Sequence, residues 1–519
     1  MDKLKPISYH KWDKHDINKL YNSMRNILQI EQPQLYYPIM SLFFYIHNTS
    51  LSHKVIDYKR HNYIKQVLHY NQDNRFSSNI SLTATTYDNI LFTEKTEELF
   101  AKVISILDPI HFILNNYNTS IPRNPYLPSN YSFNTYSKIN DMNNSAYIDV
   151  FCSFIMSNLT LEDINPSFPK YYGSVNGIND LRYDISEEYH DFKNHDGFKK
   201  LLGKRFTIDV YEKDPSSNSS DSSYDSHSSH NSNNSSNSSN SSNSSNSSNS
   251  SNSSNSSNSS NSSYSSSGNY DCNDYIVNLK HVPVIYLFIE KLKGTLEDII
   301  QDDLSIELLK SCLFQVAFAL SYVQKHYKFT HNDLHINNVM YCETNKPFLY
   351  YKLNNIYFKV PTYGKLFKII DFGRSIFTYG KKTYMNDAFS KYGEAEGQYT
   401  YPQQVSFIDD KEDKETIEPS YYFDLCRLAI TMLDEIRYNY DDKLEDNDDY
   451  QDFLDFLKFI STDKHDQRLD KVDDNFNLYI RISKDARNSL PKDILTNDFF
   501  NEYKVSKKKF PKKIYYDLN

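Results

Sequence analysis

The sequence predicts an α+β protein of two lobes, a small lobe built mainly on an antiparallel sheet and a larger, mainly helical lobe. The chain has 519 residues, which is long enough for such an arrangement. Short apolar runs typical of strands lie before and just after a tract at 215–268 that is almost wholly Ser and Asn. The clearest helical periodicity follows that tract, so we expect the helices mainly in the second half of the chain.

The Ser/Asn tract is predicted to be a disordered insert in the small lobe. It has no apolar core to bury, so folding could not offset the entropy of ordering it. Loop-closure entropy grows only logarithmically with length, so a loop of this size costs the lobe roughly 2 kcal/mol. We expect an N-terminal extension of unknown role at 1–80, the small lobe at 81–290, the large lobe at 291–505 and a basic tail at 506–519.

The elements of the small lobe are predicted from local patterns. Two short apolar runs at 89–93 and 99–104 flank a polar turn at 94–98, as in a hairpin. The segment 146–159 has apolar residues at three- and four-residue steps, which indicates a helix. A further strand is expected at 206–211, just before the tract.

After the tract, the pattern changes from strand to helix. The apolar run at 283–289 fits a buried strand, and a helix is expected to begin at Thr295. Residues 309–323 carry Leu and Val at alternating steps of four and three, which is typical of a one-sided amphipathic helix.

Composition excludes several classes of protein. A net charge of −10 argues against a nucleic-acid partner, which would favour a basic surface. Five cysteines stand singly, so neither a disulfide framework nor a zinc knuckle is predicted. No signal peptide is recognisable, and apolar runs such as 36–46 are too short to span a bilayer. A soluble, cytoplasmic protein with no membrane partner is expected. The acidic runs at 409–418 and 434–452 indicate solvated faces or a docking site for a basic substrate.

Two motifs in the second half carry the chemistry. Residues 331–339 read HNDLHINNV, and Asp371 lies within LFKIIDFGRS. Together, in this order, and after a helix and a strand respectively, they resemble the catalytic loop and the D-F-G motif of the protein-kinase superfamily. The resemblance implies a bilobal protein-kinase-like fold and transfer of the γ-phosphoryl group of ATP with Mg²⁺ as cofactor.

The resemblance assigns a role to each motif residue. Asp333 would orient the attacking hydroxyl and accept its proton, while Asn338 and Asp371 would supply the hard oxygen ligands that Mg²⁺ prefers. An ordinary polar loop would explain Asp333 and Asn338, but it would not explain why a D-F-G motif with Asp371 follows them in the sequence. A zinc site at His331 and His335 is disfavoured, because the metalloprotease pattern needs Glu directly after the first His.

Nucleotide-binding residues are predicted by the same resemblance. Lys102, in LFAKVI, matches the strand lysine that holds the phosphates, although an ordinary surface lysine would look similar. Asp149 is the candidate partner of Lys102, in place of the usual helix Glu. Ile289 is expected as the gatekeeper of the adenine pocket, with Glu290 and Leu292 offering backbone contacts.

One further residue is left with two readings. Asp424, in YYFDLCRLAITML, resembles the buried helix Asp that binds the backbone of the catalytic loop. It could equally be a carboxylate at a helix start.

Four departures from the family pattern affect the predicted function. No glycine-rich loop precedes Lys102, Asn332 replaces the usual Arg, His335 replaces the usual Lys or Arg, and residues 401–403 are a remnant at most of the A-P-E motif. The missing Gly leaves open how the phosphates are held, and the loss of Arg makes switching by phosphorylation of the activation segment unexpected. The pattern H-x-D-L-H-x-x-N recurs in haspin-like and in aminoglycoside-phosphotransferase-like kinases, so the substrate class is left open.

Local phrases such as NNSAYIDVF and FPKYYGSV resemble the divergent serine/threonine-protein kinases of giant, mimivirus-like DNA viruses. If the protein is viral, we expect it in the host cytoplasm or in the virion. The predicted function is a serine/threonine-protein kinase with an unidentified protein substrate. A small-molecule kinase and a pseudokinase scaffold are the alternatives, and the oligomeric state is not predicted.

Overall fold

The computed structural model describes residues 10–11, 14–35, 43, 56–57, 62–71, 77–88, 91–117, 127–128, 136–212, 273–302, 304–391, 393–401, 417–440, 447–472, 475–511 and 515–518. The predicted disordered tract at 215–268, the acidic residues 409–416 and the last two residues of the A-P-E remnant lie outside these ranges.

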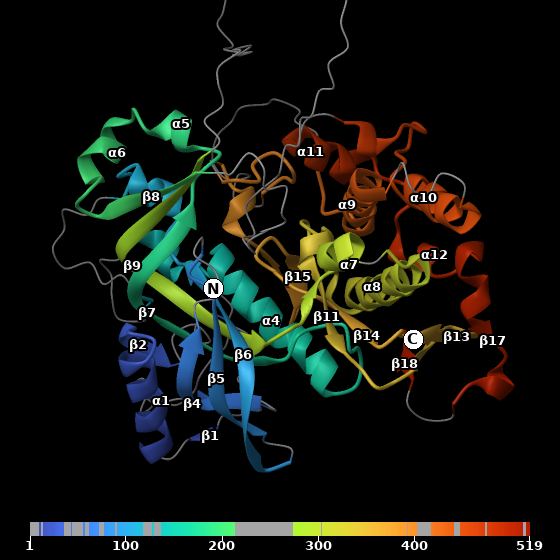
Figure 1. The fold of residues 1–519 in the computed structure, drawn as a ribbon, viewed down its shortest axis with the longest axis horizontal. Coiled ribbons are helices and arrows are strands. Elements are labelled where there is room, and N and C mark those ends of the chain that lie inside the picture. The colour runs from blue at the N-terminus through green and yellow to red at the C-terminus, as the bar shows by residue number, and fades with distance from the viewer. Residues whose placement is uncertain are drawn as a thin grey trace, which may run out of the picture.

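A curled antiparallel sheet of seven strands forms one half of the molecule (Figure 1). Its order is β2-β7-β9-β6-β5-β4, and β8 also pairs with β9. The long β7 and β9 form its spine, with β6 on one side of β9 and β8 against the far end of β9. The strands are β2 (Glu31–Leu35), β4 (Asn62–Asn71), β5 (Ile80–Asp88), β6 (Thr93–Ser105), β7 (Tyr171–Asp184), β8 (Phe206–Glu212) and β9 (Asn273–Glu290).

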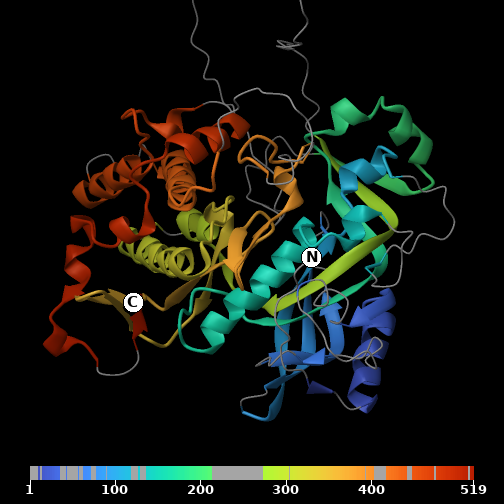
Figure 2. The same ribbon diagram turned by 180° about the vertical axis from the view of Figure 1, so that it is seen from behind.

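Helices accompany this sheet, and α4 is the one that reaches the rest of the molecule. In both views α4 lies between the sheet and the helix-rich half (Figures 1 and 2). Asn144 caps it by accepting a hydrogen bond from the amide of Ala146 at 3.0 Å, and most of its residues are buried. The helices of this half are α1 (Lys14–Asn26), α3 (Pro109–Ile113), α4 (Ser145–Leu161), α5 (Tyr189–Phe192) and α6 (Asp196–Leu201), and a two-stranded sheet joins β1 (His10–Lys11) to β3 (Ile56–Asp57).

The other half is mainly helical, with small sheets on its surface and beside α8 (Figure 1). Its helices are α7 (Leu296–Asp302), α8 (Ile306–Tyr327), α9 (Phe423–Tyr440), α10 (Asp448–Ile460), α11 (Asn475–Asp485) and α12 (Pro491–Ile494). Its strands are β10 (Gly294–Thr295), β11 (Val339–Glu343), β12 (Phe348–Leu353), β13 (Ile356–Pro361), β14 (Lys365–Ile369), β15 (Ile376–Tyr379), β16 (Lys382–Met385), β17 (Lys504–Val505) and β18 (Tyr516–Asp517).

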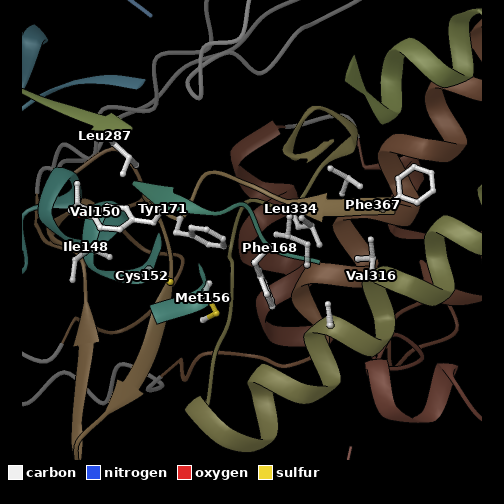
Figure 3. Packing of buried hydrophobic residues seen from close by; sticks show 14 of the residues in the cluster. Ile148, Val150, Cys152, Met156, Phe168, Tyr171, Leu287, Val316, Leu334 and Phe367 are labelled. Atoms are coloured by element: carbon white, nitrogen blue, oxygen red, sulfur yellow. The ribbon is translucent and has the colours of Figure 1, made fainter. Parts of the chain in front are cut away.

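One continuous hydrophobic cluster runs through both halves. It joins Val150 of α4 and Leu287 of β9 to Val316 of α8 and Phe367 of β14, with Phe168 between them (Figure 3). Among the described residues, α8 is the helix that is long and apolar enough to cross a membrane, but 78% of its apolar window is buried in this cluster. The close packing of the cluster fixes α4, β9 and β14 relative to one another.

Several predicted elements are confirmed. The helix predicted at 146–159 is α4, the strand at 206–211 is β8, and the run at 283–289 lies within β9. The amphipathic pattern at 309–323 lies within α8, which is buried on nearly all sides rather than on one. The helix expected at Thr295 is α7, whose start has a reciprocal cap: Asp298 donates its amide to the Thr295 side chain, and Thr295 donates its amide to the Asp298 carboxylate.

The turn of the first hairpin lies earlier in the sequence than predicted. The residues predicted as the turn, 94–98, belong to β6, and Leu91 and Phe92, predicted as strand, form the turn. Asp88 stabilises this turn by accepting a hydrogen bond from the amide of Leu91 at 3.0 Å, and Phe92 has a positive φ of 55°. The side chains of the turn are apolar, which is typical of a strand, but they are exposed in the structure, 68% for Leu91 and 76% for Phe92.

Both predicted outer boundaries cut through folded structure. The extension assigned to residues 1–80 contributes β2 and β4 to the main sheet, and α1 packs against β4. The tail assigned to 506–519 contributes β18, which pairs with β12. The strands of these two segments are short or irregular in pattern, so their place in the sheets depends on pairing with other strands.

Candidate active site

A lysine whose side chain is only 19% exposed joins two carboxylates from distant parts of the chain. Lys102 of β6 lies 2.9 Å from Oδ2 of Asp149 on α4 and 2.8 Å from Oδ1 of Asp371, two residues after β14. The Lys102–Asp149 pair expected from the sequence is therefore present, and Asp371 shares the same ammonium group. This arrangement requires β6, α4 and β14 to meet, which the common core enforces.

Backbone hydrogen bonds hold these two carboxylates in place. The amide of Phe372 donates to Oδ1 of Asp149 at 3.1 Å, so α4 is also bonded to the residue after Asp371. The amide of Gly373 donates to Oδ1 of Asp371 at 3.2 Å. Asp371 itself has a φ of 62°, a left-handed conformation that is costly for most residues and is concentrated at functional sites.

The electrostatics of the cluster favour a charged Lys102 and a charged Asp371. Burial lowers the pKa of Lys102, but the charges of Asp149 and Asp371 outweigh burial and raise it above its usual value. Burial raises the pKa of Asp371, yet the neighbouring ammonium dominates and holds it below its usual range. For Asp149 burial prevails, and its pKa is raised.

The predicted catalytic loop is anchored from α9. Asp424, at the start of α9, accepts hydrogen bonds from the amides of His331 and Asn332, both at 2.9 Å. The Asp424 contact expected from the resemblance is therefore present. Asn332 has a φ of 67°, and its side-chain amide donates to the carbonyl oxygen of Arg374 at 2.9 Å, so the loop is bonded to the segment after Asp371 as well.

Asp333 is buried and is held through one oxygen. The hydroxyl of Tyr479, on α11, donates to Oδ1 of Asp333 at 2.6 Å. Nη1 of Arg374 lies 3.6 Å from the same oxygen. Burial raises the pKa of Asp333, but Arg374, His335 and the Tyr479 hydrogen bond together lower it below its usual value. Oδ2 is thus the oxygen that could accept a hydrogen bond from a ligand in the cleft.

Asn338 is oriented by its amide nitrogen. Nδ2 of Asn338 donates to the carbonyl oxygen of Asp333 at 2.9 Å and lies 3.0 Å from Nε2 of His335. Burial lowers the pKa of His335 from 6.5 to about 4, so its ring is neutral at pH 7. Nδ1 of that ring accepts a hydrogen bond from the amide of Asn337 at 3.3 Å, so Nε2 carries the ring hydrogen and does not accept from Asn338. The bond from Nδ2 to Asp333 leaves Oδ1 of Asn338 as an oxygen able to face a cation.

The two expected magnesium ligands flank two paired strands, Asn338 just before β11 and Asp371 two residues after β14. Ile370 donates its amide to the carbonyl oxygen of Asn338 at 3.0 Å, which brings Asp371 and Asn338 into neighbouring positions. A carboxylate and an amide oxygen fit a Mg²⁺ ion that completes its shell with phosphate oxygens and water. His331 is engaged elsewhere, 2.8 Å from the carbonyl oxygen of Ile370. Within the described ranges, no group of three or more His, Cys, Asp or Glu residues could hold a metal by itself.

A cleft of about 350 Å³ opens beside the lysine cluster. Lys102, Asp149, Asp333 and Asp371 all line it. Residues 77–79 also line the cleft and lead into β5, in the stretch where the sequence has no glycine-rich loop. Asn79 is fixed there by accepting a hydrogen bond from the amide of Val103 at 2.8 Å.

The predicted adenine contacts and the expected magnesium ligand Asn338 do not line this cleft. Asn338, Ile289, Glu290 and Leu292 are not among its lining residues. The side chain of Glu290 is bonded to Lys368 at 3.1 Å and to the amide of Lys170 at 2.9 Å, and the amide of Glu290 donates to the carbonyl oxygen of Lys170 at 2.9 Å. The cleft therefore brings together Lys102, Asp149, Asp333 and Asp371 but not the predicted adenine contacts or Asn338.

Sequence reasoning missed two of the charged or polar residues around Asp333. Arg374 could have been suspected, because it directly follows the D-F-G triplet. Tyr479 gives no signal in a sequence with 45 tyrosines, and only the packing of α11 against α9 reveals it.

Comparison with known proteins adds a limited likeness. No protein-family model matches the chain. Over 91 residues the chain is 40% identical to a probable serine/threonine-protein kinase of Dictyostelium discoideum. The match covers 16% of this chain and 8% of that protein. It supports a relationship to kinases at most, and the resemblance to proteins of giant viruses is not shown.

Proposed function

We propose that the protein is an ATP- and Mg²⁺-dependent phosphotransferase with a bilobal kinase-like fold, and that it transfers the γ-phosphoryl group to serine or threonine hydroxyls of a protein. The observation that carries the proposal is the bridging of Asp149 and Asp371 by Lys102 beside Asp333 in one cleft. A buried ion cluster costs desolvation, so its retention next to a cleft favours a functional role.

Each residue has a task suited to its position. Lys102 would hold phosphate oxygens of ATP, and Asn338 and Asp371 would hold Mg²⁺, which when bound neutralises charge on the phosphates. Asp333 would accept the proton of the acceptor hydroxyl through Oδ2. The acceptor oxygen forms the new bond to the γ-phosphorus, the bond from that phosphorus to the bridging oxygen breaks, and ADP leaves.

A small-molecule kinase is the second candidate. His335 is the observation that favours it, because a neutral ring stands where the family resemblance implies a Lys or Arg. A pseudokinase scaffold is favoured by the missing glycines at residues 77–79. The oriented Asp333, Asn338 and Asp371 oppose the scaffold, since a binding module has no need of a general base.

The decisive experiment is phosphoryl transfer from labelled ATP to a panel of protein and small-molecule acceptors, with and without Mg²⁺. Loss of a general base costs about 10²- to 10⁴-fold, so Asp333→Asn should lose activity to that extent while keeping its fold. Asp455→Asn, which removes an exposed carboxylate on α10, is the matched control and should behave as wild type. Label on a soluble metabolite alone would end the protein-kinase version, and unchanged activity of Asp333→Asn would refute the catalytic role of Asp333.

A further inference from the structure

The carboxylate of Asp387, which lines the cleft, is bonded to the first turn of α4. Asp387 begins the short 3₁₀ helix η3 (Asp387–Phe389), which follows β16. Its Oδ1 accepts a hydrogen bond from the amide of Ser145 at 3.2 Å, and its Oδ2 accepts one from Nζ of Lys138 at 2.8 Å. Its own amide donates to the carbonyl oxygen of Asn143 at 2.7 Å. Three bonds thus join two segments that are more than 240 residues apart in sequence.

Asp387 has partners that stabilise a negative charge, and burial opposes them and raises its pKa. The first amides of a helix have no partner within the helix and carry the positive end of its dipole, so a carboxylate stabilises that end. Asn144 already satisfies the amide of Ala146, and Asp387 satisfies that of Ser145. Lys138 neutralises the same carboxylate, with 25% of the lysine side chain and 18% of the aspartate side chain exposed. The first turn of α4 is therefore bonded to η3 by partly buried, charge-assisted contacts.

The same contacts lead directly to the lysine cluster. Ser145 and Asp149 are four residues apart, so they lie one above the other on the same face of α4. Asn386, beside Asp387, donates its side-chain amide to the carbonyl oxygen of Gly373, and the amide of Phe372 donates to Asp149. The segment 371–373, the segment 386–387 and the first two turns of α4 thus form a closed ring of bonds around one wall of the cleft.

We propose that Asp387 is a positioning residue of the transfer site: its bonds to Lys138 and to the amide of Ser145 hold α4 where Asp149 can bridge to Lys102. The inference rests on the proposed function for its consequence in catalysis, whereas the mechanical link is independent of any reaction. Asp387 touches no reacting group itself and acts through Asp149.

The test uses the full chain and two readouts. Asp387→Asn is close to isosteric and keeps an acceptor for Ser145 but loses the charge. Asp387→Ala removes both contacts, and Lys138→Met removes the cation alone. We expect hydrogen exchange of the α4 amides and of the Phe372 amide to become at least tenfold faster in Asp387→Ala, with smaller effects in the other two. Amides of α9 should be unaffected.

Enzyme kinetics separate a positioning role from a loss of folding. The kcat of Asp387→Ala should fall about tenfold or more, with the larger part of the loss in kcat rather than in the KM for acceptor. Asp448→Asn, which removes an exposed carboxylate from the first turn of α10, is the matched control and should change neither readout. If Asp387→Ala does not fold, the isosteric variant and Lys138→Met carry the test.

The two ways of failing are distinct. Unchanged exchange of α4 and Phe372 in all three variants would overturn the positioning role, even with a fully active enzyme. Faster exchange together with no Asp333-dependent transfer by the wild type would instead reject the proposed function and the catalytic meaning of the link.

Discussion

Single residues in the cleft are governed by the balance between burial and neighbouring charge. Asp149, Asp333 and Asp371 are all buried or nearly so, and burial alone would raise the pKa of each. Lys102 and Arg374 reverse this for Asp371 and Asp333 but not for Asp149. The pKa values of Asp333 and Asp371, the two residues proposed to accept the proton and to hold the metal, are thus the ones lowered by their neighbours.

Removing Lys102 should destabilise the fold as well as the reaction. Lys102→Met would leave two carboxylates within a buried site with no cation, and breaking such a pair costs about 3–5 kcal/mol. Urea unfolding measures this free energy, and the double variant with Asp149→Asn should recover part of it. Lys95→Met, which removes a half-exposed lysine from the same strand, is the control and should change the free energy of unfolding by less than about 1 kcal/mol. Equal stability of the two single variants would contradict the coupling.

His335 predicts a loss of stability in mild acid. In the unfolded chain its pKa is 6.5, whereas in the folded protein it is lowered to about 4 by burial. As the pH falls, the unfolded state binds the proton first, so stability is full above pH 6.5 and is lost progressively toward pH 4. Between pH 7 and pH 5 this group should cost about 2 kcal/mol.

Urea unfolding at the two pH values, without added metal ions, checks this expectation. His335→Gln should lack this share of the pH dependence, while His465→Gln, at an exposed position, should retain it. An identical pH dependence for wild type and His335→Gln would show that the ring is not kept neutral by the fold.

Some residues of the candidate site are predictable from the sequence, and others are revealed only by the structure. Asp333, Asn338 and Asp371 stand in short motifs whose spacing is fixed by local loops, so the sequence predicts them as a set. Lys102 needed its strand context and Asp149 its helix periodicity. Tyr479 and Asp387 have no motif, because their roles depend on contacts between segments more than 140 residues apart.

Among the secondary-structure elements, the predictions were correct for helices that are buried and clearly capped. The α4 and α8 segments have dense apolar patterns and clear caps, and both helices are where the sequence indicated. The β5–β6 hairpin misled because its charged strand is exposed while its turn is apolar. Local propensity cannot detect that inversion, since strand pairing with β5 outweighs it.

The cap of α7 gives a prediction at this scale. Thr295→Ala would remove the acceptor for the amide of Asp298, and loss of such a cap typically costs about 1 kcal/mol. Thermal or urea unfolding measures the change. Thr496→Ala, at an exposed position near the end of α12, should cost less than about 0.5 kcal/mol. A smaller effect at Thr295 than at Thr496 would mean that α7 is held by its buried face alone.

Across the whole molecule, the shared hydrophobic cluster sets the relation between the sheet and the helices. The overall α+β class was predictable from the change of periodicity after the tract. The extent of the sheet was not, because β2 and β4 are short or irregular in pattern and join it only through pairing with β7 and β5.

The ends of the Ser/Asn insertion meet within the sheet. Glu212, the last residue of β8, is the register partner of Asn273, the first residue of β9. Replacing 213–272 by a short hairpin turn should therefore leave the fold intact and raise the free energy of unfolding by about 2 kcal/mol, through the smaller loss of loop entropy. Urea unfolding and activity of the shortened chain test this. A drop in stability would show that residues of the insertion pack on the lobe.

The same pairing makes β8 and β9 a natural place to divide the protein in two. Two polypeptides, one ending at Glu212 and the other starting at Asn273, would each carry part of the transfer site, with Lys102 and Asp149 on the first and Asp333 and Asp371 on the second. Neither fragment alone could assemble the cluster. Reassociation of the two strands would then act as a complementation switch, in which phosphoryl transfer reports the proximity of whatever proteins are fused to the cut ends.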